Sequence, residues 1–178
     1  MMKRSAAIIG LMLCSAAIFP LSVADDLTTA GIWQKRQYSF VFTGFTANYS
    51  CDGLAGKLKV LLIAAGARAD AKAHPAPCGQ FGQVDRISGA DLDFYALAPA
   101  GPTTEGERLD GAWRLVSLAE RSPRELARGD CELVEQFKAH VLPLFTTREV
   151  VDQTTCIPNQ AAGTVINLKF ESFTAARK

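Results

Sequence analysis

The sequence has 178 residues, of which 48% are hydrophobic and 21% charged, and its formal net charge is +1. A chain this close to neutral gives no electrostatic reason to expect binding to nucleic acid or to an anionic membrane. Its apolar content is that of a folded globular protein, which argues against disorder of the whole chain.

The N-terminal segment has the three parts of a cleavable secretory signal. Lys3 and Arg4 form a basic start, residues 6–18 are almost wholly apolar, and Ser22-Val23-Ala24 places small residues where a signal peptidase reads. We therefore predict cleavage after Ala24 and a periplasmic or secreted protein. The apolar run of about 13 residues is shorter than the roughly 20 that span a bilayer, which favours export over a membrane anchor.

Cys14 lies inside this signal, and a lipoprotein would be acylated at such a cysteine. Leu13 precedes it, where lipidation requires a small residue, so we expect Cys14 to be removed with residues 1–24. The remaining residues, 25–178, suit one domain with a net charge near −1.

Four cysteines remain in this exported part, and an even number in an oxidising compartment predicts a disulfide framework. They are Cys51, Cys78, Cys131 and Cys156. Four cysteines allow three pairings. Each successive pair frames a helix-like run followed by a more extended one, which favours the pairing Cys51–Cys78 and Cys131–Cys156.

The first pair follows a β-forming run at residues 37–43, and a second such run lies at residues 91–97. Between them the apolar spacing predicts an amphipathic helix, with Ser50 as N-cap and Gly66 just past its end. The apolar stripe of this helix consists of Cys51, Leu54, Leu58, Leu61, Leu62 and Ala65.

The second cysteine pair has similar neighbours. A strand is predicted at residues 112–118, and a helix then starts at Cys131 with Asp130 as its cap and Pro143 straining its end. Its apolar stripe consists of Cys131, Val134, Phe137, Val141 and Phe145. Apolar and polar residues alternate over residues 164–173, which predicts one strand with a buried face.

Together these patterns predict an α+β fold of two βαββ-like halves, at about residues 32–98 and 112–174. The expected arrangement is an antiparallel sheet with both helices on one face and two disulfides. The agreement of cysteine position, helix stripe and following strand favours an internal duplication, although two unrelated α/β units could also look alike.

The sequence supplies no motif for catalysis, a metal or a cofactor. The only histidines of the exported part, His74 and His140, lack the further ligands that a zinc site needs. Asp91 and Asp93 share one face of a strand, as paired carboxylates of a hydrolase could, but the solvent face of an amphipathic strand explains them as well.

The most aromatic stretch runs from Trp33 to Tyr49. Tyr38, Phe40 and Phe42 share one strand face and are expected in the core, under the first helix. Trp33 and Tyr49 lie outside that predicted strand, so we expect these two to form an exposed binding surface for a sugar or a peptide.

The stretch from Tyr49-Ser50-Cys51-Asp52 through Leu61-Leu62 to Gly66-Ala67-Arg68 resembles uncharacterised secreted proteins of Gram-negative bacteria. The resemblance implies a periplasmic setting and carries no activity. Because the chain has no catalytic motif, few histidines and a disulfide framework that favours rigidity, we expect a non-enzymatic module that binds a protein or another component of the cell envelope, with no cofactor. The alternatives are a small hydrolase that uses acidic residues and a carrier with a small-ligand cleft between the halves.

Overall fold

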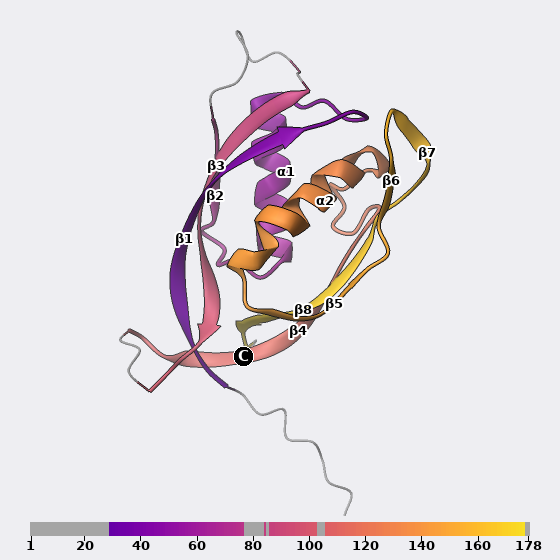
Figure 1. The fold of residues 1–178 in the computed structure, drawn as a ribbon. Coiled ribbons are helices and arrows are strands. Elements are labelled where there is room, and N and C mark those ends of the chain that lie inside the picture. Colours follow the sequence, from indigo (N-terminus) through magenta and orange to yellow (C-terminus); the bar gives the residue numbers. More distant parts are fainter. Residues whose placement is uncertain (1–28, 77–83, 85, 103–105, 177–178) are drawn as a thin grey trace, which may run out of the picture.

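The computed structural model describes residues 29–76, 84, 86–102 and 106–176 (Figure 1). Its strands are β1 Thr29–Thr43, β2 Lys72–Pro75, β3 Ile87–Pro99, β4 Leu109–Ala119, β5 Thr147–Asp152, β6 Thr155–Ile157, β7 Gln160–Val165 and β8 Asn167–Ala175. Its helices are α1 Cys51–Ala64 and α2 Cys131–His140, with short 3-10 helices η2 Arg128–Asp130 and η3 Leu142–Leu144.

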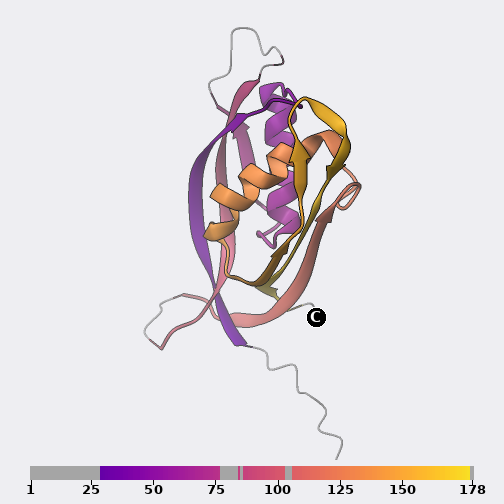
Figure 2. The ribbon, with the colours of Figure 1, turned by 45° about the vertical axis from the view of Figure 1, so that its right-hand side comes forward.

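Six strands form one antiparallel sheet in the order β2-β3-β1-β4-β8-β5, and β6 and β7 form a separate hairpin. The sheet curves around both helices, which lie on its inner side (Figures 1 and 2). The predicted α+β fold with an antiparallel sheet is therefore confirmed. No helix in the described ranges is long and apolar enough to cross a bilayer.

The sheet has two parts, β2-β3-β1 and β4-β8-β5, which are joined only by a very short pairing of β1 with β4. β1 pairs with β3 along most of its length, but it pairs with β4 only through Thr29–Gly31 and Leu109–Gly111. Antiparallel strands that share only their first residues then run apart in opposite directions. Beyond this short pairing β1 and β4 accordingly diverge from each other. The helices fill the space between the two parts of the sheet, which we call its arms (Figure 1).

Helix α1 forms as its local sequence predicts. The Ser50 Oγ accepts a hydrogen bond from the Gly53 N–H, which satisfies one of the donors left over at a helix start. Beyond the last turn, Gly66 has φ = +104°, and the N–H groups of Gly66 and Ala67 bond back to Ile63 and Leu62. This is the Schellman arrangement, which favours glycine because a Cβ is unfavourable at positive φ. The predicted stripe is buried and packs with Phe40 and Phe42.

Helix α2 is shorter than α1. It ends at His140, and Pro143 lies in the following η3, as expected of a residue that cannot continue the helical hydrogen bonds. Asp130 precedes the helix, but its carboxylate makes no cap hydrogen bond. The expectation that it caps α2 is therefore wrong, because the side chain turns back to accept from the Ala127 N–H at 2.6 Å.

The strand predicted at residues 164–173 is two strands, which is a second correction. β7 ends at Val165 and pairs with β6, whereas β8 begins at Asn167 and pairs with β4 and β5. Ile166 between them is buried, so the apolar alternation continues through the break and conceals it. The second half thus contains a hairpin that a simple βαββ unit lacks.

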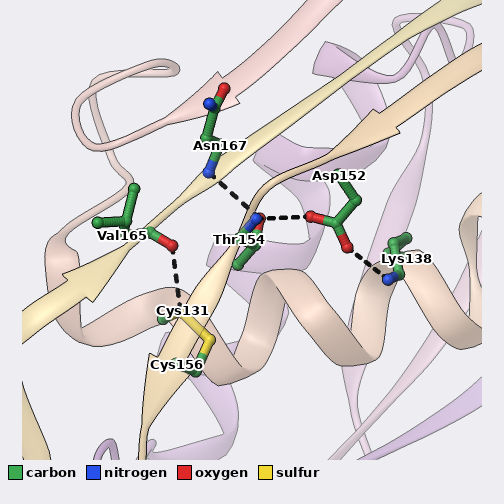
Figure 3. A network of polar contacts seen from close by, with 7 residues as sticks. All are labelled: Cys131, Lys138, Asp152, Thr154, Cys156, Val165 and Asn167. Carbon is green, nitrogen blue, oxygen red and sulfur yellow. Dashed lines mark hydrogen bonds and ion pairs between the residues drawn. A yellow bond between two sulfur atoms is a disulfide. The ribbon is translucent and has the colours of Figure 1, made fainter.

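This additional hairpin is fastened to α2 and to the main sheet (Figure 3). Cys131 at the start of α2 forms a disulfide with Cys156 in β6. Lys138 lies 2.5 Å from the carboxylate of Asp152, which also accepts from the Thr154 N–H. Partial burial acts to raise the pKa of Asp152, but the hydrogen bonds from Lys138 and Thr154 outweigh it and hold that pKa below its usual value.

The pairing predicted for the second half is confirmed, and Cys131–Cys156 is the one disulfide that the structure describes within these ranges. Cys78, the partner predicted for Cys51, lies outside the described residues. Cys51 itself does not carry a free thiol. A disulfide fits a protein that folds in an oxidising compartment.

Candidate functional site

A groove with a volume of about 510 Å³ lies where β1 and β4 separate. The end of α1 and the loop after it form one wall, and β4 with the end of β8 forms the other. Its lining consists of Trp33 from β1, Ile63 and Gly66–Ala69 from α1 and its loop, Ala112–Arg114 from β4, and Thr174–Ala176 at the end of β8. Both halves of the chain therefore contribute to one site.

Two tryptophans line this groove, one from each half, and both are half-buried. The ring of Trp113 lies 5.3 Å from that of Phe173, and the guanidinium of Arg148 lies 4.2 Å from its centroid. Phe173 is almost fully buried. Trp113 is thus held between a buried ring and a cation, an arrangement that fixes an aromatic side chain while leaving part of its surface exposed.

On the first half, Arg68 takes the corresponding place. Its guanidinium lies 3.7 Å from the ring centroid of Tyr95 and 6.0 Å from that of Trp33. The Asp70 carboxylate accepts from its Nε at 2.8 Å and its Nη2 at 2.6 Å. The bonds from Arg68 hold the pKa of Asp70 below its usual value. Arg68 is therefore in contact with Tyr95 and with Asp70 at the same time.

The second half binds the last carbonyl groups of α1, at the helix end that forms one wall of the groove. Arg114 Nη2 donates to the Ala64 carbonyl at 3.2 Å, and the buried Ser172 Oγ donates to the Ala65 carbonyl at 2.6 Å. Carbonyl groups at a helix C-terminus lack helical partners and favour a nearby cation. These bonds join the end of α1 to β4 and β8, and so connect the two walls of the groove.

Tyr49 does not belong to this groove, and its expected role in an exposed binding surface is wrong. Only 8% of its surface is exposed, and its ring packs edge-on against Phe42. Its hydroxyl donates to the Asp130 carboxylate at 2.5 Å. Burial and this hydrogen bond raise the pKa of Tyr49 far above its ordinary value.

The Tyr49 contact is part of a buried joint between the two halves. The Asp130 carboxylate, 4% exposed, also forms an ion pair with Lys57 of α1 at 2.7 Å. Beside it, the buried Glu132 accepts from the N–H groups of Phe45 at 2.9 Å and Thr46 at 3.0 Å. Two carboxylates at the start of α2 thus bind the loop and helix that follow β1.

Trp33 is the sequence-predicted residue that the structure brings into the groove, although it lies within β1 and not outside a strand. Trp113 and Arg68 were missed. A repeated pattern could have found Trp113, because Gly31-Ile32-Trp33 and Gly111-Ala112-Trp113 place glycine two residues before tryptophan in both halves. Arg68 has no such local signal, since its position depends on how the loop after α1 meets β3.

The acidic pair considered for hydrolysis lies on β3, and each carboxylate has a partner. The Ser39 hydroxyl donates to Asp91 at 2.7 Å, and Lys35 lies 3.3 Å from Asp93. His74 is opposite Asp91 in the β2–β3 pairing, whereas His140 ends α2. Within the described ranges, no three His, Cys, Asp or Glu side chains gather as a metal site requires.

Comparison of the chain with protein-family models, with curated proteins and with solved structures finds no match.

Proposed function

We propose that this protein is an exported, non-enzymatic binding module and that the groove between its halves is the binding site. The observation that carries the proposal is the convergence of Trp33 and Trp113 from the two halves on one groove, beside Arg68. Half-exposed indole rings with a few placed polar groups are typical of ligand sites.

The fixed positions of these side chains support the proposal. Trp113 is held by Phe173 and Arg148, and Arg68 by Asp70 and Tyr95. Side chains that are already ordered lose little conformational entropy when a ligand binds, so the free energy of binding is not spent on arranging them.

The proposal places the protein in the periplasm after cleavage following Ala24, bound to a protein or another component of the cell envelope. The second candidate is a small-ligand carrier, and the position of the groove favours it. Its volume of about 510 Å³ lies in the range of small-molecule sites, and both halves line it.

The proposal also treats the halves as copies of one unit. The strand order β2-β3-β1-β4-β8-β5 reads alike from both edges when β1 is matched with β4 and β3 with β8. Gly31, Trp33 and Cys51 each recur 80 positions later, and Ala30 pairs with Asp110 at the same interval. A local two-fold axis through that strand pair would relate the two tryptophans.

The test is a crosslinking capture with the tagged protein in its native envelope, followed by mass spectrometry of what is bound. The variant Trp33→Ala/Trp113→Ala should lose the captured molecule, because it removes both aromatic surfaces of the groove. Phe45→Ala is the matched control, since Phe45 is 58% exposed and does not line the groove. Capture that survives loss of both tryptophans and disappears with Phe45→Ala would place the binding surface elsewhere.

The hydrolase alternative has its own test. In the variant Asp91→Asn/Asp93→Asn we expect capture to be unchanged, because both residues lie outside the groove lining. A hydrolytic activity of the parent protein that this variant loses would favour the enzyme over the binding module.

A further inference from the structure

Among the residues that the structure describes, the charged side chains that line the groove all have one sign. Arg68 and Arg114 contribute guanidinium groups, and no carboxylate belongs to this described lining. Asp70, which pairs with Arg68, lies in an adjoining hollow with Lys35, Lys72 and Asp93. Cationic groups beside apolar walls create a positive potential that attracts an anion.

The remaining side chains of the lining are mainly apolar, from the two tryptophans, Ile63 and several alanines. Within the described part of the lining, Thr174 supplies the one aliphatic hydroxyl, and there is no amide side chain. A neutral sugar has many hydroxyl groups, and each loses water on binding unless it finds a hydrogen-bonding partner. These walls therefore suit an apolar body better than a polyhydroxylated one.

Arg68 is the group best placed to bind a carboxylate. A guanidinium carries five N–H donors in a planar fork, and the bonds to Asp70 engage only its Nε and Nη2. The side chain keeps 38% of its surface exposed while it lies against Tyr95. A ligand carboxylate could thus bind its outer edge, or compete with Asp70 for the paired edge.

We propose that the groove binds a small ligand with an apolar body and one carboxylate, with Arg68 as the carboxylate-binding residue. This inference rests on the binding role proposed above. The same chemistry occurs in a free organic acid and in the C-terminal residues of a peptide. In both, the apolar body would lie between Trp33 and Trp113, and the carboxylate would face the arginines.

The two tryptophans make the site observable, because they are the only ones in the sequence and both line the groove. Intrinsic tryptophan fluorescence of the exported protein can therefore be titrated with octanoate and with octanamide, its uncharged analogue. The inference expects octanoate to change the emission saturably and to bind at least about tenfold more tightly than octanamide, because only octanoate forms a charge-assisted hydrogen bond.

Two substitutions identify the role of Arg68. Arg68→Gln should weaken octanoate binding about tenfold and leave octanamide binding unchanged. Asp70→Asn should strengthen octanoate binding several-fold, because it removes the carboxylate that competes for the same guanidinium. If the Arg68–Asp70 pair had only a structural role, the two substitutions would not change octanoate affinity in opposite directions. Arg124→Gln, an exposed arginine outside the groove, is the matched control.

A parallel titration with the peptide Ala-Leu-Phe, with a free or an amidated C-terminus, separates the two sources of the carboxylate. Tighter binding of the free peptide than of octanoate would identify a chain terminus, and the reverse an organic acid. Equal binding of octanoate and octanamide, or saturation by maltotriose alone, would overturn the carboxylate inference and leave the groove as a binding site. An emission that no probe changes would also overturn it, and the capture experiment would then decide the binding role separately.

Discussion

The two halves of the molecule both begin with a strand and a helix and end with a long strand, but they differ in what lies between the helix and that last strand. In the first half, α1 leads to the four-residue β2 and then to β3. In the second half, α2 is shorter, and the β6–β7 hairpin is inserted between β5 and β8. The elements common to both halves form the two arms of the sheet and the groove. The hairpin is instead joined to α2 by the Cys131–Cys156 disulfide, next to the pair between Lys138 of α2 and Asp152 at the end of β5.

The two tryptophans of the groove also differ in how closely their neighbours approach them. Trp113 is packed against Phe173, with Arg148 4.2 Å from its centroid. On the first half, Arg68 approaches Trp33 only to 6.0 Å and lies mainly on Tyr95. The ring of Trp113 is therefore in closer contact with its neighbours than the ring of Trp33 is with Arg68.

The largest effect should come from breaking the joint between the halves. Asp130→Ala leaves the Tyr49 hydroxyl, Lys57 and the Ala127 N–H without their shared acceptor, so we expect a loss of about 2–4 kcal/mol in the free energy of unfolding. Glu120→Ala, which breaks the exposed pair with Arg128, should cost less than about 1 kcal/mol. Urea denaturation measures both. Equal losses would mean that the joint does not hold the halves together.

Alanine substitutions of two glycines at the β1–β4 junction should destabilise the protein less than Asp130→Ala does. A Cβ on Gly111 would lie 2.2 Å from Phe173, so Gly111→Ala should destabilise by about 2–3 kcal/mol. At Gly31 the nearest atoms are farther away, Leu97 Cδ2 at 2.8 Å and Phe173 Cε1 at 3.1 Å, and we expect a smaller loss of about 1–2 kcal/mol. Thermal denaturation of Gly111→Ala and Gly31→Ala compares the packing on the β4 side of the junction with the packing on the β1 side. A larger loss at Gly31 would contradict the view that the β4 side is the more tightly packed.

A smaller effect than that of Asp130→Ala concerns the Tyr49 phenol. Tyr49→Phe removes its hydrogen bond to Asp130 and should cost about 1–2 kcal/mol. Because the pKa is raised in the folded state, the contribution of Tyr49 is fully present below the unfolded pKa and is lost as pH rises beyond it. Alkaline absorbance titrations of the parent protein and of Tyr49→Phe differ by the phenolate absorbance of Tyr49. We expect this difference to appear only as the parent protein unfolds. Its appearance at an ordinary tyrosine pKa in the folded protein would contradict the burial.

Local signals predicted part of the fold well. Ser50 and Gly66 mark the two ends of α1 as predicted, because a side-chain cap and a positive φ depend on few neighbouring residues. Cys131 and Cys156 paired as expected because each lies beside an element that the apolar spacing identified. The buried faces of α1 and β1 followed from the same spacing.

What failed depended on distant contacts. The first strand begins at Thr29, earlier than its alternation starts, because pairing with β3 and β4 extends it, and this moves Trp33 into the sheet. Tyr49 is buried against Phe42, and its hydroxyl donates a hydrogen bond to Asp130 of the other half. Arg68 reaches the groove because its own N–H bonds to Tyr95 of β3. None of these contacts is visible within a short window of sequence.

The central claim is that residues of both halves form one binding site. Titration of the single-tryptophan variants Trp33→Phe and Trp113→Phe with octanoate tests it most directly, because each leaves one emitter on one side of the groove. The account expects both emissions to change with the same midpoint, since one ligand contacts both sides. A response from only one tryptophan, or two clearly different midpoints, would contradict a shared site.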